Sequence, residues 1–119
     1  MKKDNIVQIK SYQFALDIIE LVRNFPKKSE CLIIGKQLLR SGTSIGANVE
    51  EALAAFSKAD FIYKMNLALK ESRETHYWLR LTRDSNLLKI DLSHYINKVE
   101  ELEKILTSII KSSREGQKR

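Results

Sequence analysis

Residues 37–55, with the sequence QLLRSGTSIGANVEEALAA, decide the fold of this chain. The segment has the composition of a helix, yet small side chains crowd its centre. A glycine inside a helix costs about 1 kcal/mol relative to alanine, so an ordinary surface helix would not collect three, Gly35 included. Missing side chains allow a second helix backbone to approach closely. The segment therefore predicts a helix built for close packing, with candidate packing residues Ser41, Gly42, Ser44, Gly46 and Asn48.

The composition favours a single helical domain. The chain has 119 residues, enough for one modest core, and only one proline and four glycines among abundant helix formers. The N-terminus lacks the apolar stretch of a signal peptide, and no apolar run approaches membrane-spanning length. Cys31 stands alone, so neither a disulfide framework nor a thiol metal cluster is expected. We therefore expect a cytoplasmic protein.

Helix start and stop signals divide the chain into four helices, over about 11–25, 29–55, 57–86 and 91–110. The first helix ends at Phe25-Pro26 because proline cannot continue the hydrogen-bond ladder. Ser29, Ser57 and Asp91 are expected to cap the other three helices. Long amphipathic helices joined by short connections favour antiparallel neighbours. The sequence thus predicts an all-α, up-down-up-down antiparallel four-helix bundle.

Apolar residues at three- and four-residue steps identify the face of each helix that is expected to meet the core. In the last two helices these stripes run from Phe61 to Thr82 and from Ile96 to Ile110. In the first helix the predicted core face consists of Tyr12, Ala15, Leu16, Ile19 and Val22, widened by Ile18.

The net charge of +6 is concentrated at the two ends of the chain, outside the bundle predicted over residues 11–110. Three lysines against one aspartate give +2 in a basic arm over 1–10, and four cations against one glutamate give +3 in a basic tail over 111–119. An up-down-up-down bundle brings these segments to the same end, where they could contact phosphates. The alternative is two solvated arms that aid solubility. The candidate residues are Lys2, Lys3, Lys10, Lys111, Arg114, Lys118 and Arg119.

The third helix carries a second group of basic residues. Lys70, Arg73, Tyr77 and Arg80 fall within about a quarter-turn at 100° per residue. Tyrosine and arginine anchor protein interfaces and also stack on bases, and nearby carboxylates favour the interface role. Trp78, on an adjoining stripe, is large enough to dominate a contact between subunits.

Antiparallel neighbours that turn near residues 56–57 should have residue numbers summing to about 113. This register places Ser41 opposite Ser72 and Ser44 opposite Ala68. Arg40 falls level with Glu71 and Glu74, and we expect it to pair with one of them inside the bundle or across a subunit boundary. The alternative is an exposed arginine without a fixed partner.

Two motifs suggest chemistry, but their context does not support it. Gly42–Gly46 fits the G-x-S-x-G pattern of hydrolases, which requires a preceding strand and a parallel sheet. Asp91 and His94 have the spacing of a di-iron ligand pair, but such sites need a second pair and further carboxylates, and His76 has Arg73 three residues before it. We therefore expect no enzymatic activity, no metal and no cofactor.

Three stretches of the sequence resemble one family: FPKKSE (25–30), QLLRSGTSIGANVEEA (37–52) and KADFIYKMNLALKESRETHYWLRL (58–81). This is the four-helix-bundle family named for intervening sequences in bacterial 23S ribosomal RNA genes. It is related to the accessory variability proteins of diversity-generating retroelements. The resemblance implies up-down bundles that assemble into five-membered rings. For the retroelement relatives it implies binding to reverse transcriptase and nucleic acid.

Two classes of function follow from these observations. The first is a ring-forming accessory protein that binds RNA or DNA, in which several copies multiply weak basic patches. The second is an oligomeric scaffold for a polypeptide such as a reverse transcriptase, without a specific nucleic-acid role. Both require a homo-oligomer, which is expected because apolar surface is left over after one bundle closes.

Overall fold

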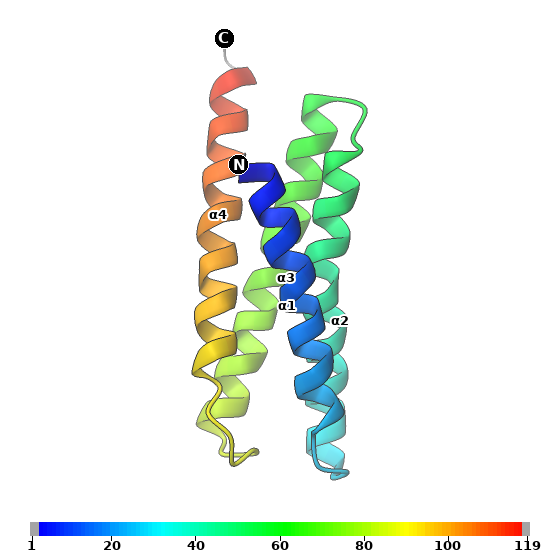
Figure 1. Ribbon diagram of the computed structural model, residues 1–119, viewed down its shortest axis with the longest axis vertical. Coiled ribbons are helices and arrows are strands. Elements are labelled where there is room, and N and C mark those ends of the chain that lie inside the picture. The colour runs from blue at the N-terminus through cyan, green and yellow to red at the C-terminus, as the bar shows by residue number, and fades with distance from the viewer. Residues whose placement is uncertain (1–2, 118–119) are drawn as a thin grey trace.

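The computed structural model describes the backbone of residues 3–117 and the side chains of residues 6–116. Within this range the chain forms an elongated bundle of 52 × 22 × 21 Å (Figure 1). Each helix packs against the two next to it around the bundle. The predicted all-α four-helix bundle is confirmed; its helices are α1 (Lys3–Arg23), α2 (Ser29–Leu53), α3 (Lys58–Asp84) and α4 (Ser93–Gln117).

Short polar signals set most of the helix ends. The Ser57 hydroxyl accepts a hydrogen bond from the Asp60 backbone N–H at 3.1 Å, which confirms Ser57 as the N-cap of α3. Asn86 ends the turn after α3 with φ of 57°, a left-handed conformation that asparagine tolerates. Asp91 accepts a hydrogen bond from the Ser93 backbone N–H at 2.9 Å. Hydrogen bonds from the side chain and backbone of Ser93 lower the pKa of the Asp91 carboxyl.

The predicted start of α2 is wrong by one residue. Lys28, rather than Ser29, is its N-cap, and the Lys28 side chain makes no capping hydrogen bond. Ser29 is the first residue of α2. The negative charge of Glu30 in the first turn interacts favourably with the positive end of the helix dipole.

Both terminal boundaries also differ from the prediction. α1 begins at Lys3 instead of Ser11, because Val7 is fully buried and extends the core stripe toward the N-terminus. α4 continues past residue 110 to Gln117. Residues 3–10 and 111–117 are therefore helix, and not the arm and tail that their charge suggested. Figure 1 places the start of α1 and the end of α4 toward the same end of the bundle, as predicted.

The core is built from one continuous stripe on each helix. The stripes predicted for α3 and α4 are confirmed, since Met65, Leu79, Leu102 and Leu106 have no more than 1% of their surface exposed. The face predicted for α1 is wrong at Tyr12 and Leu16, which are 63% and 45% exposed, but its burial of Ile18 is confirmed, and Val22 packs against the core. The α1 core residues are Val7, Ser11, Phe14, Ile18 and Leu21.

The error in α1 has a physical cause. This helix is apolar on two opposite faces, and periodicity alone does not say which of them meets the core. In the structure the face that carries Ser11 and Ile18 lies against Gly46 and Gly42 of α2, where a missing side chain lets α1 approach closely. A second apolar stripe is therefore left on the outside of α1.

Candidate nucleic-acid interface and helix-packing cluster

The small residues of α2 form two packing surfaces that face different neighbours. A Cβ atom added at Gly42 would lie 3.0 Å from the Ile18 side chain, and one at Gly46 would lie 3.3 Å from the Ser11 backbone oxygen. These glycines therefore let α1 approach closely, whereas the sequence register had placed Ser41 and Ser44 opposite α3. The Ser41 side faces α3, where the Thr75 hydroxyl donates to Ser41 Oγ at 2.8 Å.

The side chains of Ser44 and Asn48 form hydrogen bonds to backbone carbonyls of α2 itself. The Ser44 hydroxyl donates to the Arg40 carbonyl at 2.6 Å, and the Asn48 amide donates to the Ser44 carbonyl at 2.9 Å. The G-x-S-x-G stretch thus lies in the middle of a helix, and no strand precedes it among the described residues. It lacks the strand-to-helix turn that a serine nucleophile needs.

The predicted pairing of Arg40 is confirmed inside the bundle, with both carboxylates rather than one. Arg40 donates to Glu71 at 2.9 Å and also pairs with Glu74. The Trp78 indole N–H donates to the same Glu74 carboxylate at 3.3 Å, and the Tyr77 and Trp78 rings meet edge to face at 5.2 Å. One cluster therefore joins α2 to α3 through a bifurcated ion pair and its aromatic neighbours.

A double-mutant cycle with Arg40→Met and Glu74→Gln should show coupling between the two residues. Arg40→Met should lower the free energy of unfolding by about 1–2 kcal/mol, because it leaves Glu71, with 12% of its side chain exposed, without its cation. We expect a coupling energy of about 0.5–1 kcal/mol from urea unfolding. The same cycle on the exposed pair Glu20–Arg23 should give about 0.3 kcal/mol. Additive losses at Arg40 and Glu74 would show that the pair does not hold α2 to α3.

A basic groove runs along the seam between α3 and α4. It consists of two adjoining hollows of about 540 and 500 Å³, which share Leu69, Arg73 and Thr107. The hollow nearer the end of α4 is also lined by Lys111, Arg114 and one carboxylate, that of Glu115. The structure thereby unites Arg73 from one predicted group with Lys111 and Arg114 from the other. Among the described side chains, none of these three cations has an ion-pair partner.

The other hollow has a different electrostatic character. His76 lies there between two carboxylates of α4, 3.0 Å from Glu103 and 3.6 Å from Glu100. Lys104 also lines this hollow. These two carboxylates offset Arg73 and Lys104, whereas three cations face the single carboxylate of Glu115 in the hollow toward the end of α4, so the excess of positive charge lies there.

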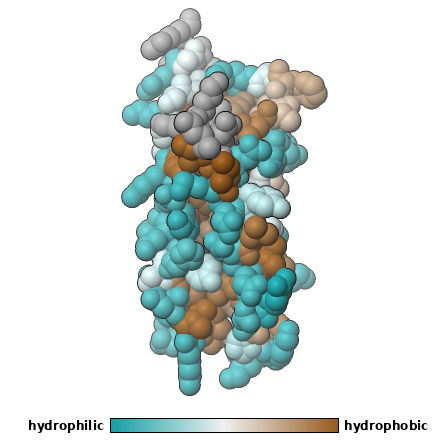
Figure 2. Space-filling model, viewed as in Figure 1, coloured by the Kyte–Doolittle hydropathy of each residue, from teal (hydrophilic) through white to brown (hydrophobic). Residues whose placement is uncertain are grey.

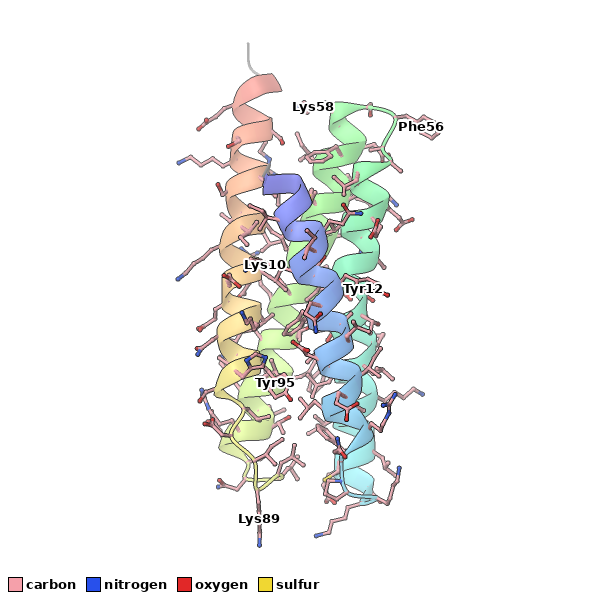
Figure 3. The ribbon with its side chains drawn as sticks, viewed as in Figure 1. Lys10, Tyr12, Phe56, Lys58, Lys89 and Tyr95 are labelled. Carbon is pink, nitrogen blue, oxygen red and sulfur yellow. The ribbon has the colours of Figure 1, made fainter. Side chains whose placement is uncertain are left out.

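The remaining predicted cations are placed elsewhere or outside the described residues. Lys10 lies in the α1–α4 seam, 3.3 Å from Glu101, and is therefore already paired (Figure 3). Lys70 and Arg80 are exposed on α3, outside the residues that line the two hollows. The Lys3 side chain, Lys2, Lys118 and Arg119 lie outside the described residues.

Among the groove residues that sequence reasoning missed are Asn66, Lys104 and Thr107. A signal for two of them is present, because Lys104 and Thr107 precede Lys111 by seven and four residues, which places all three on one side of a helix. The sequence does not show that this side of α4 adjoins Arg73, so the spacing by itself indicates only an ordinary solvent-exposed helix face.

An exposed apolar surface, here called the outer apolar face, covers α1 and the adjoining side of α2. Tyr12 and Leu16 of α1 and Leu39 of α2 are each more than a third exposed, and Tyr12 and Leu16 border a hollow of about 370 Å³. Figure 2, viewed from the side of α1, shows brown patches between hydrophilic side chains. The outer apolar face consists of Tyr12, Leu16, Ile19, Leu39 and Ala47.

The described residues contain no group of three metal-binding side chains placed to hold an ion. His94 of the Asp91–His94 motif lies 3.5 Å from Asp17 of α1. No helix in the described part of the chain has the length and apolar character needed to cross a membrane.

The fold and groove define a small helical-bundle protein with a cationic surface. The chain belongs to the 23S rRNA-intervening sequence protein family, whose model matches residues 3–108. Its structure is similar to that of a protein of unknown function from the S23 ribosomal protein family of Bacteroides thetaiotaomicron. The TM-score is 0.86 at 45% sequence identity, and the match covers 92% of this chain and 99% of the other. No curated protein matches the chain. The family expected from the sequence is confirmed.

Proposed function

We propose that this protein is a non-enzymatic, cytoplasmic accessory factor that binds RNA and works as a homo-oligomer. The observation that carries the proposal is the meeting of Arg73 of α3 with Lys111 and Arg114 of α4 in one groove. Cations without carboxylate partners are free to neutralise phosphates and release counterions. Membership of a family named for ribosomal RNA supports RNA as the ligand.

Binding of a structured RNA, followed by electrophoretic shift across a salt series, tests this function. We expect affinity to fall steeply as salt rises, because phosphate contacts release counterions. Deleting residues 111–119 should leave the fold intact, since the last fully packed residues, Ile109 and Ile110, precede the cut. The truncation should weaken binding, because it removes Lys111 and Arg114. A full-length protein that binds no RNA at low salt would exclude the proposed function and leave the protein-scaffold alternative.

The homo-oligomer is proposed from the outer apolar face, and the five-membered ring from the family resemblance. Light scattering should therefore give a mass several times the 13.8 kDa of one chain at micromolar concentration. Leu16→Glu places a charge on this face and should shift the protein toward monomers. Gln13→Glu, on an exposed but different side of α1, is the matched control and should not. A mass of one chain for the unmodified protein would contradict the proposed assembly.

A further inference from the structure

We propose that the α3–α4 groove binds a single-stranded segment of RNA, and that Asn66 and Thr107 contact its riboses while the cations contact its phosphates. This inference rests on the proposed function and adds the class of RNA and the way it is recognised. It concerns the hollow of about 500 Å³ that Arg73, Lys111 and Arg114 line together with the carboxylate of Glu115.

The shape of the site favours a single strand over a duplex. The groove lies between two directly packed helices, whose axes in such contacts are about 8–10 Å apart. A duplex is wider than this spacing, so its phosphates reach only the rim. A single strand can lie along the seam, as strands do in other positively charged grooves that follow the backbone.

The inner wall of the groove is suited to the sugar part of the strand. Leu69 and Ile110 are nearly buried and supply an apolar floor, 6% and 4% exposed. The Thr107 hydroxyl donates to the Glu103 carbonyl at 2.7 Å, and the Asn66 amide N–H donates to the Ile62 carbonyl at 3.1 Å. Their oxygens are left as acceptors beside the cations.

A hydrogen-bond acceptor beside a phosphate-binding site can distinguish RNA from DNA through the ribose 2′-OH. The ribose 2′-OH can donate a hydrogen bond to Thr107 Oγ1 or Asn66 Oδ1, whereas deoxyribose has no such donor. The cations hold either backbone through charge alone. The groove is therefore expected to bind single-stranded RNA more tightly than single-stranded DNA of the same sequence.

The test measures fluorescence anisotropy with three labelled probes: a single-stranded RNA, a single-stranded DNA of the same sequence, and an RNA hairpin. Arg73→Gln with Lys111→Gln should weaken binding of single-stranded RNA about tenfold and flatten its salt dependence by roughly one unit of slope per cation. Arg23→Gln with Lys98→Gln removes the same charge from side chains that are outside the groove, and should change affinity less than twofold.

A second pair of variants tests the ribose contact. Thr107→Val should weaken RNA binding about fivefold through the loss of one hydrogen bond and leave DNA binding unchanged. Ser44→Ala is the control, because Ser44 also donates to its own helix, at 2.6 Å to the Arg40 carbonyl, but lines neither the groove nor the hollow on the outer apolar face. Circular dichroism establishes that each variant is folded. If the Arg73 variant fails to fold, Lys104→Gln with Lys111→Gln on α4 replaces it.

The outcomes separate the inference from the proposed function. If the unmodified protein binds RNA but groove variants behave like their controls, the groove is not the site and the proposed function stands. If the hairpin binds as tightly as the single strand, or if DNA matches RNA, the assignment to single-stranded RNA is overturned. If the unmodified protein binds no probe at low salt, the proposed function itself fails.

Discussion

Gly46→Leu should lower the free energy of unfolding by about 3 kcal/mol, a large part of the 5–15 kcal/mol that stabilises a typical domain. The Cβ alone would lie 3.3 Å from the Ser11 backbone oxygen, and the rest of the leucine would have to displace α1. Backbone cannot rotate away as a flexible side chain can. The strain therefore exceeds the gain of about 1 kcal/mol expected from replacing glycine inside a helix.

Ala59→Leu is the control for this prediction. Position 59 is exposed near the start of α3 and lies outside the outer apolar face, so a leucine there adds a comparable side chain without meeting the α1 backbone. We expect its free energy of unfolding, measured with urea, to change by less than about 0.5 kcal/mol. A Gly46→Leu protein as stable as the Ala59→Leu protein would show that α1 does not need the close approach seen at Gly46.

Phe14→Ala should lower the free energy of unfolding by about 3–5 kcal/mol, because it opens a cavity in a core that can relax only in part. Phe14 is 2% exposed and is among the largest fully enclosed side chains of the described residues. It lies on the α1 face that sequence periodicity did not select, so this variant also tests the orientation of the helix.

The matched control is Tyr63→Ala, which removes an aromatic ring of similar size from an exposed position on α3. Tyr63 is 59% exposed, and the expected loss is less than about 1 kcal/mol. The two variants are compared by urea unfolding at one protein concentration, because assembly makes apparent stability depend on concentration. Equal losses would mean that Phe14 is not a core residue and that α1 is rotated relative to the structure.

Local sequence signals were sufficient to predict the extent of α3 and the core-facing sides of α3 and α4. Ser57 and Asp60 mark the start of α3, and the apolar stripe through Met65 and Leu79 has a single clear face. A helix with one apolar face has one way to pack, so periodicity determines its orientation. The pairing of Arg40 with Glu71 and Glu74 was predictable for a related reason, since a short turn sets the register of antiparallel helices.

The same reasoning was insufficient for α1 and for the groove. The choice between Tyr12 and Phe14 as core residue depends on which neighbour the α2 glycines admit, and that contact joins segments about thirty residues apart. The groove is likewise made by contact, because Arg73 and Lys111 belong to separate helices whose exposed faces are unremarkable by themselves.

The sequence by itself determined the helical class, the four-helix architecture, the family and the α2–α3 register. These follow from local hydrogen bonding, hydrophobic period and turn length, which act within one helix or one connection. Tertiary structure alone decided which face of α1 is buried, and which unpaired cations line one hollow together with Asn66 and Thr107. Both features depend on how closely two helix backbones can approach each other. That distance is set by the shapes of both packed surfaces together, so it cannot be read from either helix alone.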